Sequence, residues 1–115
     1  MRVDETKRGD IAIISLIGNM VGTCEAELLH HEVRAFIKNK KNKIILDMKD
    51  VHWMGSLCIG AIMREIIAAR QNHGDVYLAS LTKKVRRLFK LTKLDNSVGI
   101  FPTVDAAVQE FNGKN

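Results

Sequence analysis

The chain has 115 residues, of which 46% are hydrophobic and 27% are charged, and its formal net charge is +5. This length suits one compact domain and is too short for two independent cores, and the composition lies far from that of disordered or fibrous proteins. No stretch approaches the roughly 18 uninterrupted apolar residues of a membrane-spanning helix. The polar start MRVDETKRGD carries no export signal, so we expect a single cytoplasmic domain over residues 1–115.

The first half of the chain alternates between strand and helix patterns. Residues 11–17, IAIISLI, form an apolar, β-branched run typical of a buried strand, and a weaker alternation in residues 1–6 predicts an edge strand paired with it as a hairpin. Apolar residues at helical spacing predict a helix from about Glu25 to Lys38. After a lysine-rich break, residues 44–48, IILDM, predict a second buried strand.

The second half continues the alternation. Ser56 can cap a helix that runs to about Gln71, and the glycine-containing NHGD ends it. Thr82 can cap the short helix that follows the next strand. Such an order predicts an α/β fold, a mixed and mainly parallel sheet of about five strands with about four helices packed against it. The remaining elements are predicted strands at residues 76–80 and 98–101 and predicted helices at residues 83–91 and 104–111.

The cysteines and the tryptophan are predicted to be core residues. Cys24 and Cys58 form no CxxC pair and are too few for a disulfide framework, so we expect small reduced side chains inside a cytosolic core. Trp53, just before the second helix, is predicted to anchor that core.

No catalytic or metal-binding pattern stands out. The histidines lack HExxH spacing, and the neighbours His30 and His31 point about 100° apart on a helix. No nucleophile-elbow pattern places a base beside Ser56 or Cys58. We therefore expect neither an enzyme nor a bound metal or cofactor.

A basic run accompanies the predicted helix at residues 83–91. Its charges alternate with apolar residues in the manner of an amphipathic helix whose charges face water. An acidic protein surface is the second interpretation, and a lipid headgroup or nucleic acid is the third, although nucleic-acid motifs are lacking, so we expect no direct nucleic-acid partner. The run consists of Lys83, Lys84, Arg86, Arg87, Lys90 and Lys93.

Three segments together carry a family resemblance. They are GDIAIISLIGNMVGTCEAEL, KIILDMKDVHWMGSLCIGAIM and VRRLFKLTKLDNSVGIFPTVDAAV, and they span nearly the whole chain, from about Gly9 to Phe111. In this order and spacing they resemble the STAS domain, specifically the bacterial anti-sigma-factor antagonists. The resemblance implies a STAS-like fold and a non-enzymatic module that sequesters an anti-sigma factor of the serine-kinase type. It also implies that phosphorylation of a hydroxyl at the turn between strand and helix switches the module off.

The resemblance also implies where a partner binds. In the slots where the family carries an aspartate, this sequence has Val21 and Gly55, and Leu57 occupies the second hydroxyl slot. Ser56 is therefore the phosphoacceptor candidate, with a purely structural role as helix cap as the alternative, and Leu57 is expected to be a partly exposed hydrophobic anchor. The predicted partner-binding residues are Asn19, Met20, Val21, Gly22, Thr23, Gly55, Ser56, Leu57 and Ile59.

Two other functions stay open. One is an unphosphorylated STAS scaffold subunit of a signalling or lipid-transport complex, which would use Leu57 and Trp53. The other is a nucleotide- or anion-binding regulatory domain that would use the two glycine-containing turns and the basic helix. The sequence leaves the oligomeric state open, with a dimer among the options.

Overall fold

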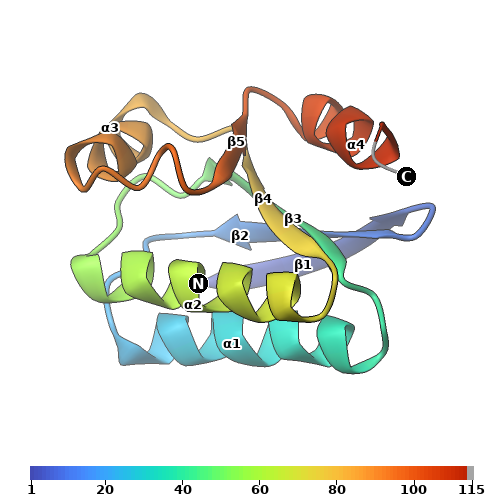
Figure 1. The fold of residues 1–115 in the computed structure, drawn as a ribbon. Helices are drawn as coiled ribbons and strands as arrows, with labels where there is room; N and C mark the ends of the chain where they lie inside the picture. Colours follow the sequence, from blue (N-terminus) through green and yellow to red (C-terminus); the bar gives the residue numbers. More distant parts are fainter. Residues whose placement is uncertain (114–115) are drawn as a thin grey trace.

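A computed structural model describes residues 1–113 and confirms the predicted order of strands and helices (Figure 1). The main differences are at the ends of elements, since the first helix begins at Thr23 and the last strand has only three residues. The elements are β1 Arg2–Arg8, β2 Ile11–Ile17, α1 Thr23–Lys38, β3 Lys43–Asp50, α2 Ser56–Gln71, β4 Asp75–Ala79, α3 Lys83–Leu91, β5 Gly99–Phe101 and α4 Val104–Asn112.

The five strands form one sheet in the order β1-β2-β3-β4-β5. β1 and β2 are an antiparallel hairpin joined by a two-residue turn, in which Gly9 takes the left-handed φ of +64° that glycine adopts at little cost. The other neighbours are parallel, because a helical segment returns the chain to the same end of the sheet between each pair. The predicted mixed, mainly parallel sheet is thus confirmed.

Helices cover both faces of the sheet. α1 and α2 lie side by side on one face, where Leu29 and Ile62 pack in the same cluster as Ile14. α4 lies on the other face, where the rings of Tyr77 and Phe111 stack with centroids 4.0 Å apart. Burial on both faces explains why the central strands are almost continuously apolar in sequence.

Two predicted core residues lie at the surface instead. Trp53 is 41% exposed because it stands in an extended segment beside the inward-pointing Met54, and neighbours in such a segment point to opposite sides. Cys24 is exposed because it is two residues before the buried Ala26 on α1, which places it on nearly the opposite side of the helix. Cys58 is buried, as predicted.

The edges of the sheet are poor surfaces for strand pairing. β1, with the sequence RVDETKR, is mostly charged, and β5 is very short. Both features discourage association through the sheet edge. None of the helices in the described part of the chain is long and apolar enough to cross a bilayer.

Candidate partner-binding site

The candidate site lies where β2 and β3 end side by side and lead into α1 and α2. The loops after these strands continue the sheet, because the Met20 amide donates to the Trp53 carbonyl at 3.0 Å and the Gly55 amide donates to the Met20 carbonyl at 2.8 Å. Met20 and Met54 form an isolated parallel bridge at this point. The two loops are therefore one bonded unit rather than two independent segments.

The side chains of this unit divide into a buried and an exposed set. Met20, Met54 and Ile59 are buried and attach the unit to the core. Val21 and Leu57 remain 55% and 52% exposed, although both are large and apolar. Of the predicted partner-binding residues, Met20 and Ile59 thus support the surface from below, whereas Leu57 is exposed as expected.

The start of α1 is held by Glu25. Its Oε1 accepts hydrogen bonds from the amide of Gly22, the N-cap residue, at 2.9 Å and from the amide of the preceding Val21 at 3.2 Å. The Cys58 thiol on α2 donates to the Gly22 carbonyl at 3.5 Å, joining the starts of the two helices. Burial raises the pKa of the Cys58 thiol, and the nearby negative charge of Glu25 raises it further, so the thiol stays protonated as this donor.

The start of α2 is capped by Gly55, not by Ser56. Gly55 has extended backbone angles, and its carbonyl accepts from the amides of Cys58 at 3.1 Å and Ile59 at 3.2 Å. Ser56 is already the first helical residue, so its side chain is one position too late to cap, and the predicted capping role is wrong. Its hydroxyl is exposed and has no hydrogen-bond partner within residues 1–113.

Gly55 also permits the two loops to approach closely. A Cβ atom built there would lie 3.2 Å from the Val21 carbonyl oxygen, which is tighter than most real contacts of this kind. The aspartate that the family resemblance places at this position would require the loops to move apart by a few tenths of an ångström. The absence of a side chain at Gly55 is thus part of how this site is packed.

A groove of about 350 Å³ continues the exposed surface between α1 and α2. Small residues form much of it, and the exposed Leu57 is one of its lining residues. We call Val21, Ser56, Leu57 and this groove the loop surface. The groove is lined by Thr23, Ala26, Glu27, Leu57, Gly60, Ala61 and Arg64.

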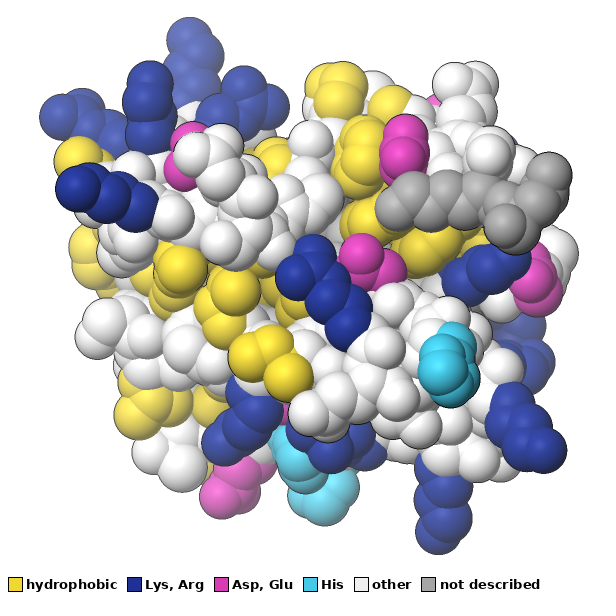
Figure 2. Space-filling model, in the orientation of Figure 1, with side chains coloured by type: hydrophobic (Ala, Val, Ile, Leu, Met, Phe, Trp, Pro, Cys, Tyr) yellow, Lys and Arg dark blue, Asp and Glu magenta, His cyan; other side chains and the backbone are white. Residues whose placement is uncertain are grey.

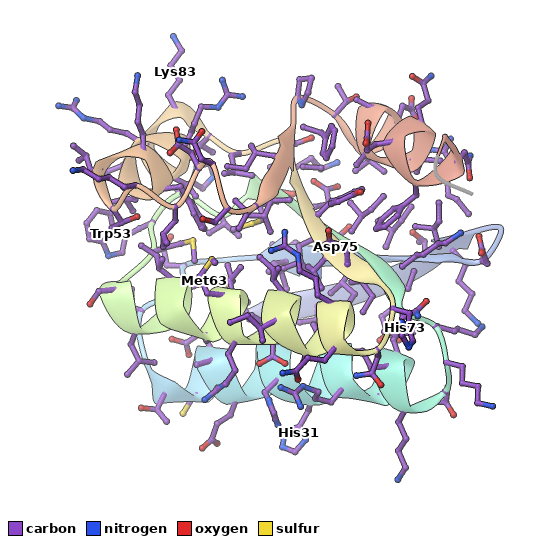
Figure 3. The ribbon with its side chains drawn as sticks, viewed as in Figure 1. His31, Trp53, Met63, His73, Asp75 and Lys83 are labelled. Atoms are coloured by element: carbon purple, nitrogen blue, oxygen red, sulfur yellow. The ribbon has the colours of Figure 1, made fainter. Side chains whose placement is uncertain are left out.

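Trp53 lies at the margin of the loop surface, between the start of α2 and α3 (Figure 3). The Nζ atom of Lys84 on α3 is 5.1 Å from the centre of its ring, within the range of a cation–π contact. Within residues 1–113 no group of three or more His, Cys, Asp or Glu side chains is arranged to hold a metal ion. The loop surface thus offers apolar contacts and a free hydroxyl, with Glu27 and Arg64 as the charged residues of its groove.

Fold and site together define a small α/β domain whose hydrogen-bonded, partly apolar loops suit the binding of another protein. The model of the STAS domain family matches residues 2–107, and the chain belongs to that family. A Thermotoga maritima protein with the provisional name of anti-sigma factor antagonist is 33% identical over 79 residues, which are 69% of this chain and 70% of that protein.

Solved structures agree with this assignment. The crystal structure of a Thermotoga maritima protein with the same provisional name matches with a TM-score of 0.87 at 28% identity, covering 94% of this chain and 92% of the other. The phosphorylated form of the Bacillus cell fate determinant SpoIIAA matches with a TM-score of 0.73 at 15% identity, covering 96% and 99% of the two chains, which shows the shared fold alone. The predicted family and fold are confirmed, and the relatives are named as regulatory proteins rather than enzymes.

Proposed function

We propose that this chain is an anti-sigma-factor antagonist that binds a serine-kinase anti-sigma factor through residues 19–23 and 55–59 and so frees a sigma factor. The observation that carries the proposal is the pair Val21, in the loop before α1, and Leu57, in the first turn of α2, which are large, apolar and more than half exposed. Exposed apolar side chains grouped on one surface are typical of protein-binding sites. The names of the relatives support the class of partner.

The rigidity of the loop surface supports a binding role. The hydrogen bonds between residues 20, 53 and 55 and the contact between Cys58 and Gly22 fix both loops before any partner arrives. A surface that is already ordered loses little conformational freedom on association. Most of the free energy gained when a partner buries the Leu57 side chain can therefore appear as binding affinity.

Ser56 is the phosphoacceptor in this proposal. Its hydroxyl is exposed, has no hydrogen-bond partner within the described chain, and stands at a helix N-terminus, where free amides and the helix dipole favour a phosphate. A phosphoserine carries a charge near −2 at neutral pH. Placed beside Leu57, that charge would have to be desolvated in the complex, so phosphorylation would weaken binding.

A constitutive binding subunit, of a signalling or lipid-transport complex, is the second candidate. It is favoured by Val21 and Gly55, which stand in both positions where the family pattern has a carboxylate. An anion-binding domain has less support, because the Gly55 amide already donates to Met20 and is not free for a ligand.

The binding proposal can be tested through Trp53, which is the only tryptophan in the sequence. Chain labelled with 5-fluorotryptophan gives a single ¹⁹F resonance from the edge of the loop surface. We expect a purified serine-kinase anti-sigma factor from the same organism to shift or broaden this resonance, and the ATP-binding domain of an unrelated histidine kinase to leave it unchanged. The experiment is repeated with each serine-kinase anti-sigma factor of that organism, which together form the test panel. If no member of this panel affects the resonance, the proposed function is wrong.

The switch needs its own experiment. The kinase that binds is incubated with ATP and either the native chain or Ser56→Ala, and both products are weighed by mass spectrometry. We expect one phosphate on the native chain, none on Ser56→Ala, and weaker binding of the phosphorylated chain. A kinase that binds both chains and phosphorylates neither would favour the constitutive subunit.

A further inference from the structure

We infer that α3 is a second part of the same interface, a cationic surface that recognises an acidic patch on the protein bound at the loop surface. This inference rests on the proposed function, since it assigns a charge pattern to the proposed partner. It is carried by the distribution of charge over the chain and by the position of α3 beside Trp53.

The positive charge of the protein is concentrated on one short segment. Between Asp75 and Asp95 the chain has six basic residues and no acidic one, whereas the rest has 12 basic and 13 acidic residues. Without this segment the net charge would be −1 instead of +5. The net charge therefore belongs to α3 and its immediate C-terminal flank, not to the surface as a whole.

The charges on α3 do not stabilise the fold through ion pairs. Several basic residues elsewhere in the chain do have acidic partners, since Arg34 pairs with Glu65, Arg70 with Asp75 and Lys43 with Asp10. On α3 and its flank, all six basic side chains are exposed and none pairs with an acidic group of the described chain. These residues are Lys83, Lys84, Arg86, Arg87, Lys90 and Lys93.

The other side of α3 packs against the core. Val85 and Phe89 are fully buried in the same cluster as the α1 and α2 packing residues. A basic helix that binds by insertion into a bilayer needs a continuous free apolar side, whereas α3 exposes one large apolar side chain, Leu91 at its C-terminal end. Six exposed basic side chains outnumber this single apolar one, so recognition by α3 comes mainly from charge, which suits an acidic protein surface.

The cationic surface adjoins the loop surface through Trp53. The Trp53 ring lies under Lys84, and its carbonyl accepts from the Met20 amide, so the same residue contacts α3 and belongs to the bonded loop unit. In Figure 2 the basic side chains gather at the upper left, directly above hydrophobic side chains at the left edge, and Figure 3 shows Trp53 between them and α2. One partner can cover both parts at once.

Charges at the margin of an interface act mainly on the rate of encounter and on its dependence on salt. The test compares a triple variant of α3, Arg86→Gln with Arg87→Gln and Lys90→Gln, with a control that loses the same charge at the opposite end of the molecule. The control carries Lys7→Gln, Lys38→Gln and Lys40→Gln, from the hairpin and the end of α1. Circular dichroism verifies that both variants are folded.

The probe is the anti-sigma factor that binds the native chain, and association is followed by stopped flow at 50 and 500 mM NaCl. We expect the association rate constant of the native chain and the control to fall roughly tenfold over this range. The α3 variant should associate several-fold more slowly at 50 mM NaCl, lose most of the salt dependence, and dissociate at nearly the native rate.

Other outcomes overturn the inference. If the α3 variant keeps the native rate and salt dependence while Leu57→Asp abolishes binding, α3 is outside the interface and the proposed function stands. If the α3 variant binds the anti-sigma factor normally but loses binding of phosphatidylglycerol vesicles or of single-stranded DNA that the native chain retains, the surface serves a membrane or a nucleic acid. If nothing in the panel binds the native chain, the proposed function itself fails and this inference with it.

Discussion

Arg34 on α1 donates a hydrogen bond of 2.9 Å from Nε to Oε1 of Glu65 on α2, whose side chain is completely buried. His30 Nδ1 lies 3.1 Å from the other carboxylate oxygen, and Arg64 Nε is more distant at 3.5 Å. This contact joins the two helices whose N-terminal ends carry the loop surface. The free-energy cost of burying a carboxylate is offset only while the carboxylate is paired.

The first prediction concerns the asymmetry of this pair. Arg34 is 40% exposed and can be hydrated if Glu65 is removed, but Glu65 cannot be hydrated if Arg34 is removed. We expect Arg34→Met to lower the free energy of unfolding by about 1.5 to 3 kcal/mol, the range for a lost hydrogen bond to a charged group. Glu65→Met should lower it by less, as measured by urea denaturation.

Arg64→Met is the matched control for that measurement. Arg64 is 60% exposed and is the more distant arginine, so its loss should change stability by less than about 0.5 kcal/mol. Equal effects of Arg34→Met and Arg64→Met would contradict the view that Arg34 compensates the buried charge.

The second prediction tests whether the side chain of Ser56 contributes to stability as a cap of α2. Because Gly55 caps α2 through its backbone, Ser56→Ala should leave the free energy of unfolding within about 0.5 kcal/mol of the native value. Thr103 caps α4, since its Oγ1 accepts from the Ala106 amide at 3.0 Å, so Thr103→Ala should lower stability by about 1 kcal/mol. A loss for Ser56→Ala as large as that for Thr103→Ala would restore the capping role.

The third prediction is a pH dependence of stability set by Glu32 on α1. A hydrogen bond with Glu5, partial burial and the negative charge of Glu5 together raise the pKa of Glu32 from 4.5 to about 7. Between these values the folded chain holds a proton that the unfolded chain has released, so this contribution is complete below pH 4.5 and is lost as the pH rises through 7.

Urea denaturation between pH 5 and pH 8 measures this effect. The stability of Glu32→Gln relative to the native chain should increase across the range, since glutamine keeps the hydrogen bond without ionising. Glu27→Gln, at an exposed position on the same helix, is the control and should follow the native curve. If Glu32→Gln also runs parallel to the native curve, the two carboxyl groups do not share a proton.

The sequence predicts the fold well because its apolar pattern is strong. Continuous runs such as residues 11–17 leave little choice but a strand buried on both faces, and glycines and polar breaks separate the elements. The exposure of Leu57 also follows from its place in the first turn of a helix. These features depend on local periodicity, which one sequence displays directly.

The features that the sequence does not reveal depend on contacts between distant segments. The outward position of Trp53 and the capping by Gly55 both follow from pairing of the loop at residues 53–55 with Met20, more than 30 residues earlier. The burial of Glu65 depends on partners on another helix. Local periodicity does not reveal such long-range pairs. The general preference of tryptophan for the core and of serine for the N-cap therefore led to wrong predictions for Trp53 and Ser56.

Leu57 is the proposed anchor of the protein interface, and α2 itself provides a control residue for it. Leu57 and Ile67 are both apolar residues of α2 with 52% exposure, but only Leu57 lies on the loop surface. The most direct measurement is the Kd of the serine-kinase anti-sigma factor for the native chain, Leu57→Asp and Ile67→Asp by isothermal titration calorimetry. We predict that Leu57→Asp weakens binding by roughly 30-fold or more, as expected for a lost hot spot of at least about 2 kcal/mol, while Ile67→Asp binds like the native chain. Equal Kd values for the folded Leu57→Asp variant and the native chain would show that Leu57 lies outside the interface.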